Sequence, residues 1–192
     1  MNEVPVFEWI ISEDDNRTGV DFVALVDEPA ISMNWQAFKE QKRKFQADHE
    51  RRIISGPLMV ANLPIYRNDE RGEYYGIFRP QTIEKVALKF MKNRFTSNVN
   101  MMHDQSLVAD GVYMFESFLI DEKRGIKAPD GYGDLPDGSW FGSFKVDNET
   151  IWNEYIKTGV FRGFSVEGIF YDQPLGDAPL DLIEELEKII LG

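Results

Sequence analysis

Short apolar stretches recur along the chain, and polar or turn-forming residues separate them. Runs of this kind, bounded by glycine, proline, asparagine and aspartate, are typical of β-strands. Gly56 and Pro57 are expected to interrupt one of them. The strands predicted in this way cover residues 4–11, 20–26, 52–67, 73–79, 98–103, 111–121, 140–146 and 161–172.

A helical period replaces the strand pattern in four segments. The clearest example has Pro80 near its start and apolar residues at i, i+3, i+4 and i+7 spacing, which is typical of an amphipathic helix. The charged stretch 39–52 is interpreted as a solvated helix end or a linker. The predicted helices cover residues 80–93, 147–159, 32–47 and 180–191. Their candidate caps are Thr82, Asn148 or Asp147, and Ser32.

Many strands with a few helices, and no regular alternation between them, indicate the fold class. The pattern predicts either an α+β protein or a β-barrel core flanked by helices. The glycine-, proline- and aspartate-rich stretch 122–139 is predicted to be a loop, and its length is typical of functional loops.

Composition narrows the classes of function. The chain has 192 residues, 43% of them apolar, which suits one domain with a terminal extension. Its net charge of −12 argues against binding to nucleic acid or to an anionic membrane surface. No apolar run is long enough to cross a bilayer, and the acidic residues 1–15 do not resemble a signal peptide. Cysteine is absent, which excludes disulfides and thiol catalysis.

The sequence contains only two histidines. His103 ends an apolar run just before a loop, where a strand holds a side chain still and the loop leaves it accessible. It is therefore a candidate general base, and a structural, half-buried histidine is the alternative. His49 lies in the charged stretch QADHERR and is expected to be exposed. With no cysteine and no second histidine nearby, no metal site is predicted.

Ser165 is the candidate nucleophile. It lies in the stretch RGFSVEG, with Gly163 two residues before it and Gly168 three residues after it. In a strand over 164–170, Ser165 and Glu167 would share one face, and the glycines would let another chain approach closely. A serine nucleophile needs a base and backbone N–H donors for the oxyanion, and a glycine-flanked strand can supply access and donors. The alternative is an ordinary strand serine, and the spacing does not match the G-x-S-x-G elbow.

A third residue is needed to orient the histidine. Glu116 shares one face of the predicted strand 112–120 with apolar residues, so its carboxylate would need a partner. An antiparallel pairing of this strand with the preceding one would bring His103 within reach. Glu167, on the face of Ser165, is the rival, and Asp104 is a third option that points the wrong way if the strand continues.

The order of these motifs resembles the XkdF-like serine protease domain of tailed phages and prophages. The resemblance covers about residues 53–172, with residues 1–52 as a lead-in of strands and a helix and 173–192 as a linker and an amphipathic helix. Such domains are grouped with the phage prohead proteases, which are similar to the herpesvirus assembly protease. The motifs that carry the resemblance are GPLMV, EYYGIFRPQTIEKVALKFM, NMMHD, ESFLID and WFGSFKVDNETIWNEYIKTGVFRGFSVEG.

The resemblance implies a herpesvirus-protease-like barrel in which His103 is the general base and Ser165 is the nucleophile. The herpesvirus relatives use a second histidine as the third member. This chain has none near the site, so Glu116 and Glu167 both stay open as candidates. No cofactor is implied. The oxyanion and the substrate backbone are expected to contact Arg162, Gly163 and Val166.

The resemblance also implies a role in virion assembly. The expected activity is a serine endopeptidase that cleaves the scaffold protein or the major capsid protein inside the assembling prohead, in the host cytoplasm. A homodimer is expected by analogy, and the loop 122–139 is a candidate substrate flap. The alternative is a non-catalytic virion or scaffold-binding protein that retains the protease fold. A carboxylate-rich site for Ca²⁺ or Mg²⁺ is a third, weaker hypothesis.

Overall fold

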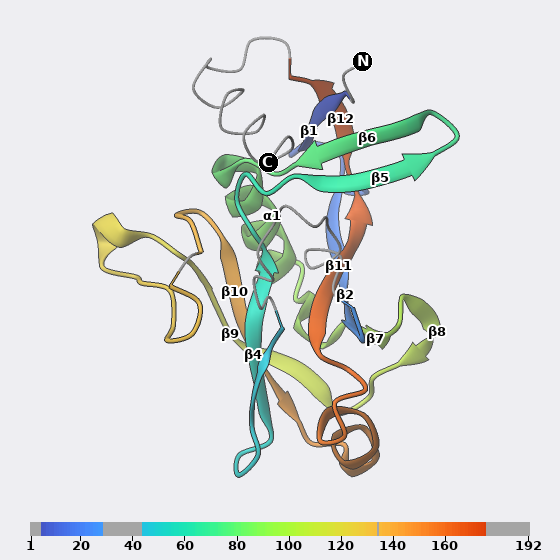
Figure 1. Ribbon diagram of the computed structural model, residues 1–192, viewed down its shortest axis with the longest axis vertical. Coiled ribbons are helices and arrows are strands. Elements are labelled where there is room, and N and C mark those ends of the chain that lie inside the picture. Colours follow the sequence, from blue (N-terminus) through green and yellow to red (C-terminus); the bar gives the residue numbers. More distant parts are fainter. Residues whose placement is uncertain (1–4, 29–43, 134, 176–192) are drawn as a thin grey trace.

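The computed structural model describes residues 5–28, 44–133 and 135–175. These residues form three four-stranded sheets and one long α-helix (Figure 1). The predicted α+β class is therefore confirmed. The predicted barrel is not found, because no pairing among the described residues joins the end strands of a sheet into a closed cylinder. The predicted helices 32–47 and 180–191 lie wholly or mostly outside the described residues.

The first sheet joins the beginning and the end of the described chain. Its order is β12 (Tyr171–Pro174), β1 (Val6–Ile10), β6 (Gly72–Ile77) and β5 (Ile65–Asp69). Strand β1 pairs antiparallel with β12 and parallel with β6, and a tight hairpin joins β5 to β6. This sheet forms the upper part of the molecule in Figure 1.

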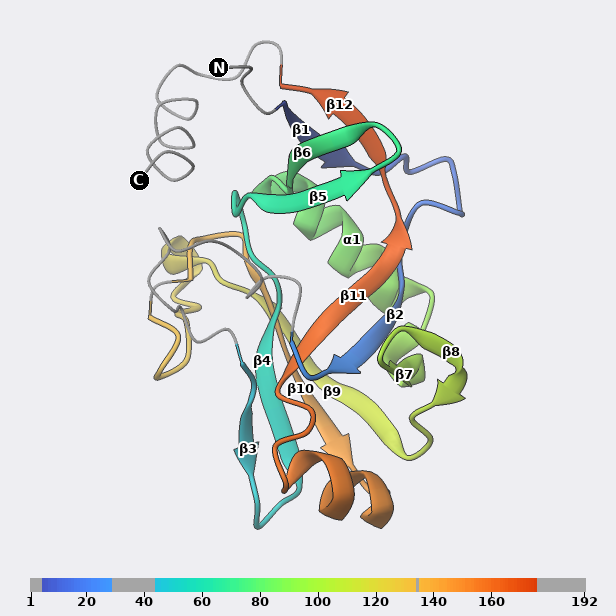
Figure 2. The ribbon, with the colours of Figure 1, turned by 45° about the vertical axis from the view of Figure 1, so that its right-hand side comes forward.

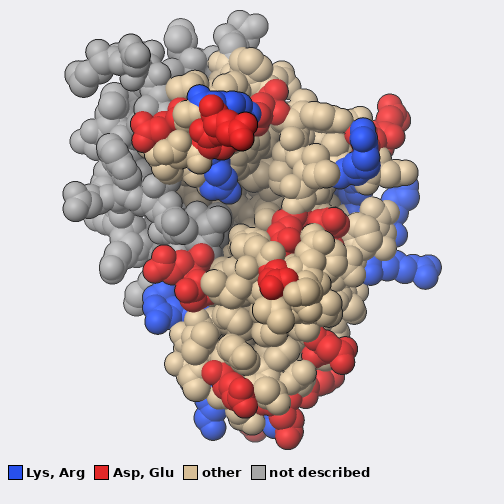
Figure 3. All heavy atoms as spheres, turned by 90° about the vertical axis from the view of Figure 1, so that its right-hand side faces the viewer, with Lys and Arg blue, Asp and Glu red and all other residues tan. Residues whose placement is uncertain are grey.

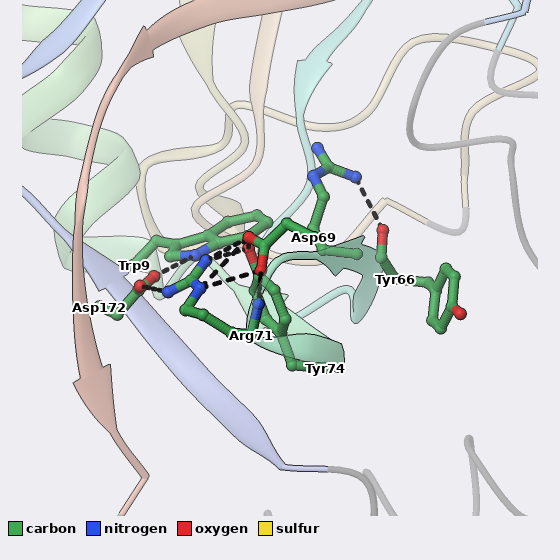
Figure 4. A network of polar contacts seen from close by, with 7 residues as sticks. Trp9, Tyr66, Asp69, Arg71, Tyr74 and Asp172 are labelled. Atoms are coloured by element: carbon green, nitrogen blue, oxygen red, sulfur yellow. Dashed lines mark hydrogen bonds and ion pairs between the residues drawn. The ribbon is translucent and has the colours of Figure 1, made fainter.

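A network of polar contacts ties the β5–β6 hairpin to strand β12 (Figure 4). The Arg71 guanidinium pairs with Asp69, at 2.7 Å, and with Asp172. The Tyr74 hydroxyl donates to Asp69 at 2.9 Å, and Trp9 Nε1 donates to Asp172 at 2.9 Å. The Arg71 charge and its hydrogen bonds hold the pKa of Asp69 well below its usual range. These contacts therefore hold the β5–β6 hairpin against strands β1 and β12.

The second sheet is antiparallel throughout. Its order is β3 (Gln46–Asp48), β4 (Ile53–Met59), β10 (Trp140–Val146) and β9 (Val112–Leu119). The interpretation of 39–52 as a helix end or linker is wrong for its described part, which forms β3 and the turn to β4. Gly56 and Pro57 also do not interrupt β4, which runs through both.

The third sheet carries the candidate site. Its order is β11 (Gly163–Ile169), β2 (Gly19–Val26), β7 (Val99–Met101) and β8 (Asp104–Val108) (Figure 2). Strand β2 pairs antiparallel with β11 and parallel with β7. Strands β11 and β8 are the end strands, so each has one edge without a partner strand in this sheet. Strands β1 and β2, which precede residue 52, thus pair with strands that follow it.

Helix α1 (Pro80–Lys92) is the predicted helix, with Pro80 at its start. The predicted cap is wrong: Arg79 is the N-cap residue, and Thr82 lies buried in the first turn. The segment 147–159 contains a π-helix, Ile151–Ile156, and Asn148 accepts a hydrogen bond from Ile151 N at 3.0 Å, as expected of its cap. The remaining helical turns are 3₁₀: Phe95–Ser97 and Glu122–Arg124.

One large apolar core fills the space between the sheets and α1. Phe164 on β11 packs against Phe144 on β10, with ring centroids 4.7 Å apart, and Phe90 on α1 packs against Trp140 at 5.3 Å. A smaller cluster around Phe141 lies under the loop 122–139. The inward face of β11 is therefore held by aromatic contacts, which leaves its other face for polar residues.

Trp9 packs flat against the backbone of β6, and only glycine permits this contact. A Cβ atom at Gly76 would lie 2.0 Å from the Trp9 ring. Trp9 also packs against Phe78, with the rings tilted and their centroids 4.9 Å apart. The position of Trp9 thus depends on Gly76.

We expect Gly76→Ala to lower the free energy of unfolding by about 3 kcal/mol, because Trp9 must leave its packed position. Urea unfolding followed by circular dichroism measures this. The matched control is Gly133→Ala, where a Cβ atom meets nothing within 4 Å. Equal stability of the two variants would show that Trp9 is not packed as described.

The turn between β7 and β8 has an unusual backbone. Met101 pairs with Asp104, so Met102 and His103 form a two-residue hairpin loop. Both have positive φ, 56° and 61°, which is the signature of a type I′ turn. Asparagine and glycine favour these angles, whereas methionine adopts them at a cost of about 1 kcal/mol. The backbone of the turn formed by Met102 and His103 is therefore strained.

Replacing Met102 by Asn should raise the free energy of unfolding by about 1 kcal/mol, because asparagine tolerates positive φ. Met102 is exposed, so little apolar packing is lost. Thermal or urea unfolding of the two proteins gives the difference. A loss of stability in the variant would argue against a left-handed residue at this position.

Candidate active site

Three side chains lie in one row across the third sheet. Ser165 on β11 is opposite Ala24 on β2, and Ala24 is opposite Asn100 on β7. Neighbouring residues in such a row project to the same face of a sheet. Ser165 is 6% exposed and Asn100 is fully buried. The sheet thus places two polar side chains on the face opposite the one that carries Phe164.

Glu167 follows Ser165 by two residues and shares its face. One of its oxygens, Oε1, accepts a hydrogen bond from Asn100 Nδ2 at 2.5 Å. The same oxygen lies 3.2 Å from His103 Nδ1. The Glu167 side chain is 17% exposed and that of His103 is 45% exposed. The carboxylate is therefore held between a buried amide and an accessible imidazole.

A β-bulge follows Glu167 on strand β11. The register between β11 and β2 shifts between Glu167 and Gly168. A Cβ atom at Gly168 would lie 1.9 Å from the carbonyl oxygen of Gly19, so the close approach of the two strands requires glycine there. This confirms the expected close approach at Gly168.

Ser165 and Glu167 also line a cavity of about 510 Å³. Its floor is β11, and its other walls are the end of β4 and residues of the first sheet, among them Trp9, Ile65, Arg67 and Phe78. Figure 3 shows a hollow between the upper and lower parts of the molecule, with acidic groups on its lower margin. Ser165 is thus buried and borders this cavity.

The cavity holds charges of both signs. Asp21 lines it beside β11, and burial raises the pKa of the Asp21 carboxyl, with a further contribution from the negative charge of Glu167. Burial likewise lowers the pKa of the Arg67 guanidinium on the opposite wall. Among the described residues, no group of three or more His, Asp or Glu side chains is arranged to hold a metal ion.

Of the predicted residues, the structure brings together His103 and Glu167, with Ser165 on the same strand as Glu167. No hydrogen bond between Ser165 and His103 is present in the described part of the chain. The main-chain N–H of Arg162 donates to Val26 O at 2.8 Å, so this N–H is not free to bind an oxyanion. Gly163 and Val166 lie on β11, whose outer edge has no partner strand in the sheet.

Glu116 lies elsewhere. The predicted pairing of strand 112–120 with the strand before His103 is wrong, because β9 pairs with β10 in the second sheet. A bulge at Phe115 also shifts the alternation of β9, so Glu116 is exposed and does not lie on the apolar face. His103 therefore has Glu167, and not Glu116, as its carboxylate partner.

Two other predicted features lie apart from these residues. His49, in the β3–β4 turn, is exposed as expected, and its ring is edge-on to Trp152 with ring centroids 5.6 Å apart. The described residues of the loop 122–139, a candidate flap, are not among those that line the cavity. The loop packs back on β10, and the Tyr132 hydroxyl lies 2.6 Å from Lys44 O and 3.1 Å from Ser55 O.

Sequence analysis missed Asn100, Asp21 and Arg67. Asn100 interrupts the apolar residues of the NVNMM stretch, and a polar residue within a buried strand is a signal that was available. Its Oδ1 is buried and has no hydrogen-bond partner in the part of the chain that the structure describes. Asp21 and Arg67 follow ordinary strand alternation, and only the three-dimensional arrangement reveals that they face one cavity.

Comparison with known proteins identifies a family for this chain. A family model described as "Putative phage serine protease XkdF" matches residues 41–172, which include Ser165, His103 and Glu167. No curated protein and no solved structure gives a significant match. None of the helices that the structure describes has the length and apolar character needed to span a membrane. The family match covers more than half of the chain, which therefore belongs to the phage serine protease family named after XkdF.

Proposed function

We propose that the chain is a serine endopeptidase with Ser165 as nucleophile, His103 as general base and Glu167 as the residue that orients the base. The contact that carries the proposal is the 3.2 Å approach of His103 Nδ1 to Glu167 Oε1. A carboxylate at Nδ1 favours the tautomer with the proton on that nitrogen, which leaves Nε2 free to accept a proton. Family membership supplies the reaction class.

The spacing along β11 suits a triad. Side chains two residues apart on a strand lie on one face, roughly 6.6 Å apart. In the proposed triad, the imidazole that contacts Glu167 through Nδ1 turns so that its Nε2 reaches Ser165 on the same face. His103 lies in a hairpin loop and is half exposed, so the surroundings leave room for that motion. Catalytic hydrogen bonds are often long in the absence of substrate.

The reaction then follows from these roles. Ser165 Oγ attacks the scissile carbonyl carbon while its proton passes to His103 Nε2. The tetrahedral intermediate collapses to an acyl-enzyme as His103 returns the proton to the leaving amine. Water, deprotonated by His103, then attacks the acyl carbon, and His103 returns that proton to Ser165 Oγ as the bond to the acyl group breaks and the second product leaves. Main-chain N–H groups on the outer edge of β11, near Gly163 and Val166, are the proposed oxyanion donors.

The proposed substrates are proteins of the assembling phage head, namely the scaffold protein or the major capsid protein. The phage origin of the family and its protease class support this proposal. The herpesvirus-protease-like fold, a homodimer and action inside the prohead in the host cytoplasm belong to the same proposal and rest on the resemblance of the sequence motifs.

The second candidate is a non-catalytic virion or scaffold-binding protein that retains the fold. One observation favours it: no hydrogen bond joins Ser165 to His103 among the described residues. The exposed apolar residues of the end strand β8, Leu107 and Val108, would suit contact with another protein. Loss of activity on substitution of Ser165 separates the two candidates.

Ser165→Ala should abolish cleavage of scaffold or capsid protein when it is co-expressed with the head proteins of the same phage. The expected loss of rate is at least about 10³-fold, because the nucleophile is removed. Gel electrophoresis follows processing, and thermal unfolding checks that the fold is intact. Processing at the wild-type rate would rule out Ser165 as the nucleophile.

Glu167→Gln should lower the cleavage rate by about 10² to 10⁴-fold, because the neutral amide no longer holds the imidazole in the tautomer that leaves Nε2 free. Initial rates of processing by the variant and the wild-type protein give the ratio.

The matched control is Asp104→Asn, in the same hairpin. The Asp104 carboxylate bonds to Ser106, with Oγ at 2.6 Å, and is not among the partners of His103. This variant should keep the rate within about threefold. If both variants lowered the rate equally, a general effect of charge would replace the specific role of Glu167.

A further inference from the structure

Arg67 contributes a positive charge to the lining of the cavity. Strand β5 places it on the wall opposite β11, where it lines the same cavity as Ser165. Its guanidinium carbon lies 5.4 Å from the centroid of the Trp9 ring, and Nη1 donates to the Tyr66 carbonyl oxygen at 2.9 Å. In the described part of the chain no carboxylate forms an ion pair with it, whereas Arg71 nearby pairs with two.

A half-buried guanidinium without a counter-ion is costly. It has five N–H donors, of which the Tyr66 carbonyl uses one. Burial also disfavours the charged form of Arg67, and a bound anion would stabilise that charged form. The guanidinium carbon lies over the Trp9 ring, and a carboxylate can match the edge of a guanidinium group with two parallel hydrogen bonds.

The rest of the cavity narrows the kind of ligand. Its walls include the apolar side chains of Leu58, Ile65 and Phe170, which suit the body of a peptide side chain. Asp21 and Glu167 line the β11 side, so an anionic group is repelled there and attracted toward Arg67. An acidic ligand is therefore expected to bind with its carboxylate toward Arg67 and away from Asp21 and Glu167.

We propose that Arg67 binds a carboxylate of the peptide substrate, namely a glutamate or aspartate side chain close to the scissile bond. The proposal rests on the proposed function, because it assigns the substrate class of that same site. A free α-carboxylate at a peptide C-terminus offers the same chemistry, so the experiment must distinguish the two sources. Arg67 is then a specificity-determining residue, while the reaction steps stay with Ser165 and His103.

The experiment uses the full chain with Ser165→Ala, immobilised, so that bound peptides are not cleaved. The probes are N-acetylated heptapeptide amides in which one position is Glu, Gln or Lys and the others are randomised. Mass spectrometry of the retained peptides gives the enrichment of each class. We expect Glu to be enriched about tenfold over Gln, the size expected of a charge-assisted hydrogen bond.

Adding Arg67→Gln should reduce that ratio to about one, and Arg67→Glu should reverse the preference toward Lys. Arg67→Lys should keep part of the preference, because the charge remains but the two parallel hydrogen bonds do not. The matched control is Arg51→Gln in the β3–β4 turn, whose side chain is 73% exposed and outside the cavity. It should keep the full preference for Glu.

Two results would overturn the proposal: an unchanged Glu preference in Arg67→Gln, or no retention of any peptide class. Retention that requires a free C-terminus, tested with the same library lacking the amide, would assign Arg67 to the α-carboxylate and overturn the side-chain version. Because binding is measured without turnover, Arg67-dependent retention together with an inactive wild-type protein would refute only the proposed function.

Discussion

The candidate site depends on one carboxylate that is held from two sides. Glu167 receives a hydrogen bond from a fully buried amide, Asn100, and contacts the accessible imidazole of His103. The strand pairings make this possible, because β2 places β11 and β7 on either side of itself and aligns Ser165 with Asn100. The aromatic packing of Phe164 behind the sheet fixes which face of β11 carries the polar residues. A shift of one residue in this register would turn Ser165 and Glu167 toward the core.

The walls of the cavity belong to different sheets, and the chain connects them through β11 and β12. These two strands follow one another directly, so the floor of the cavity continues into the sheet that forms its opposite wall. Trp9, packed on Gly76 and bonded to Asp172, anchors that wall. The proposed substrate recognition and the proposed chemistry are therefore linked through one continuous stretch of chain.

Local patterns in the sequence were sufficient for much of the fold. The helix 80–93 and the apolar strands were predictable because period and turn residues are local properties. The closed barrel was not, since strand partners are chosen by long-range packing. The part of 39–52 that forms a hairpin is charged, and its pairing with β4 leaves no periodic trace. The same limit explains Glu116, whose exposure results from a bulge that strict alternation does not reveal.

In the candidate site, too, some residues could be recognised from local sequence and others only from long-range packing. Ser165, His103 and Glu167 carry chemically distinctive side chains in short motifs, so they could be named as candidates. Choosing between Glu116 and Glu167 required the pairing of β7 with β2, which is not local. Asn100 and Arg67 can be recognised as candidates only from their neighbours. Asn100 donates a hydrogen bond to the Glu167 carboxylate, and Arg67 lies over Trp9 with no ion-pair partner among the described residues.

The central claim, that His103 activates Ser165, is tested most directly by labelling the folded protein with a fluorophosphonate and locating the adduct by peptide mass spectrometry. The account predicts one adduct, on Ser165. This adduct should not form when the protein is denatured by heat before labelling, or when His103 is replaced in His103→Gln. Absence of labelling, or labelling of Ser165 that persists without His103, would contradict it.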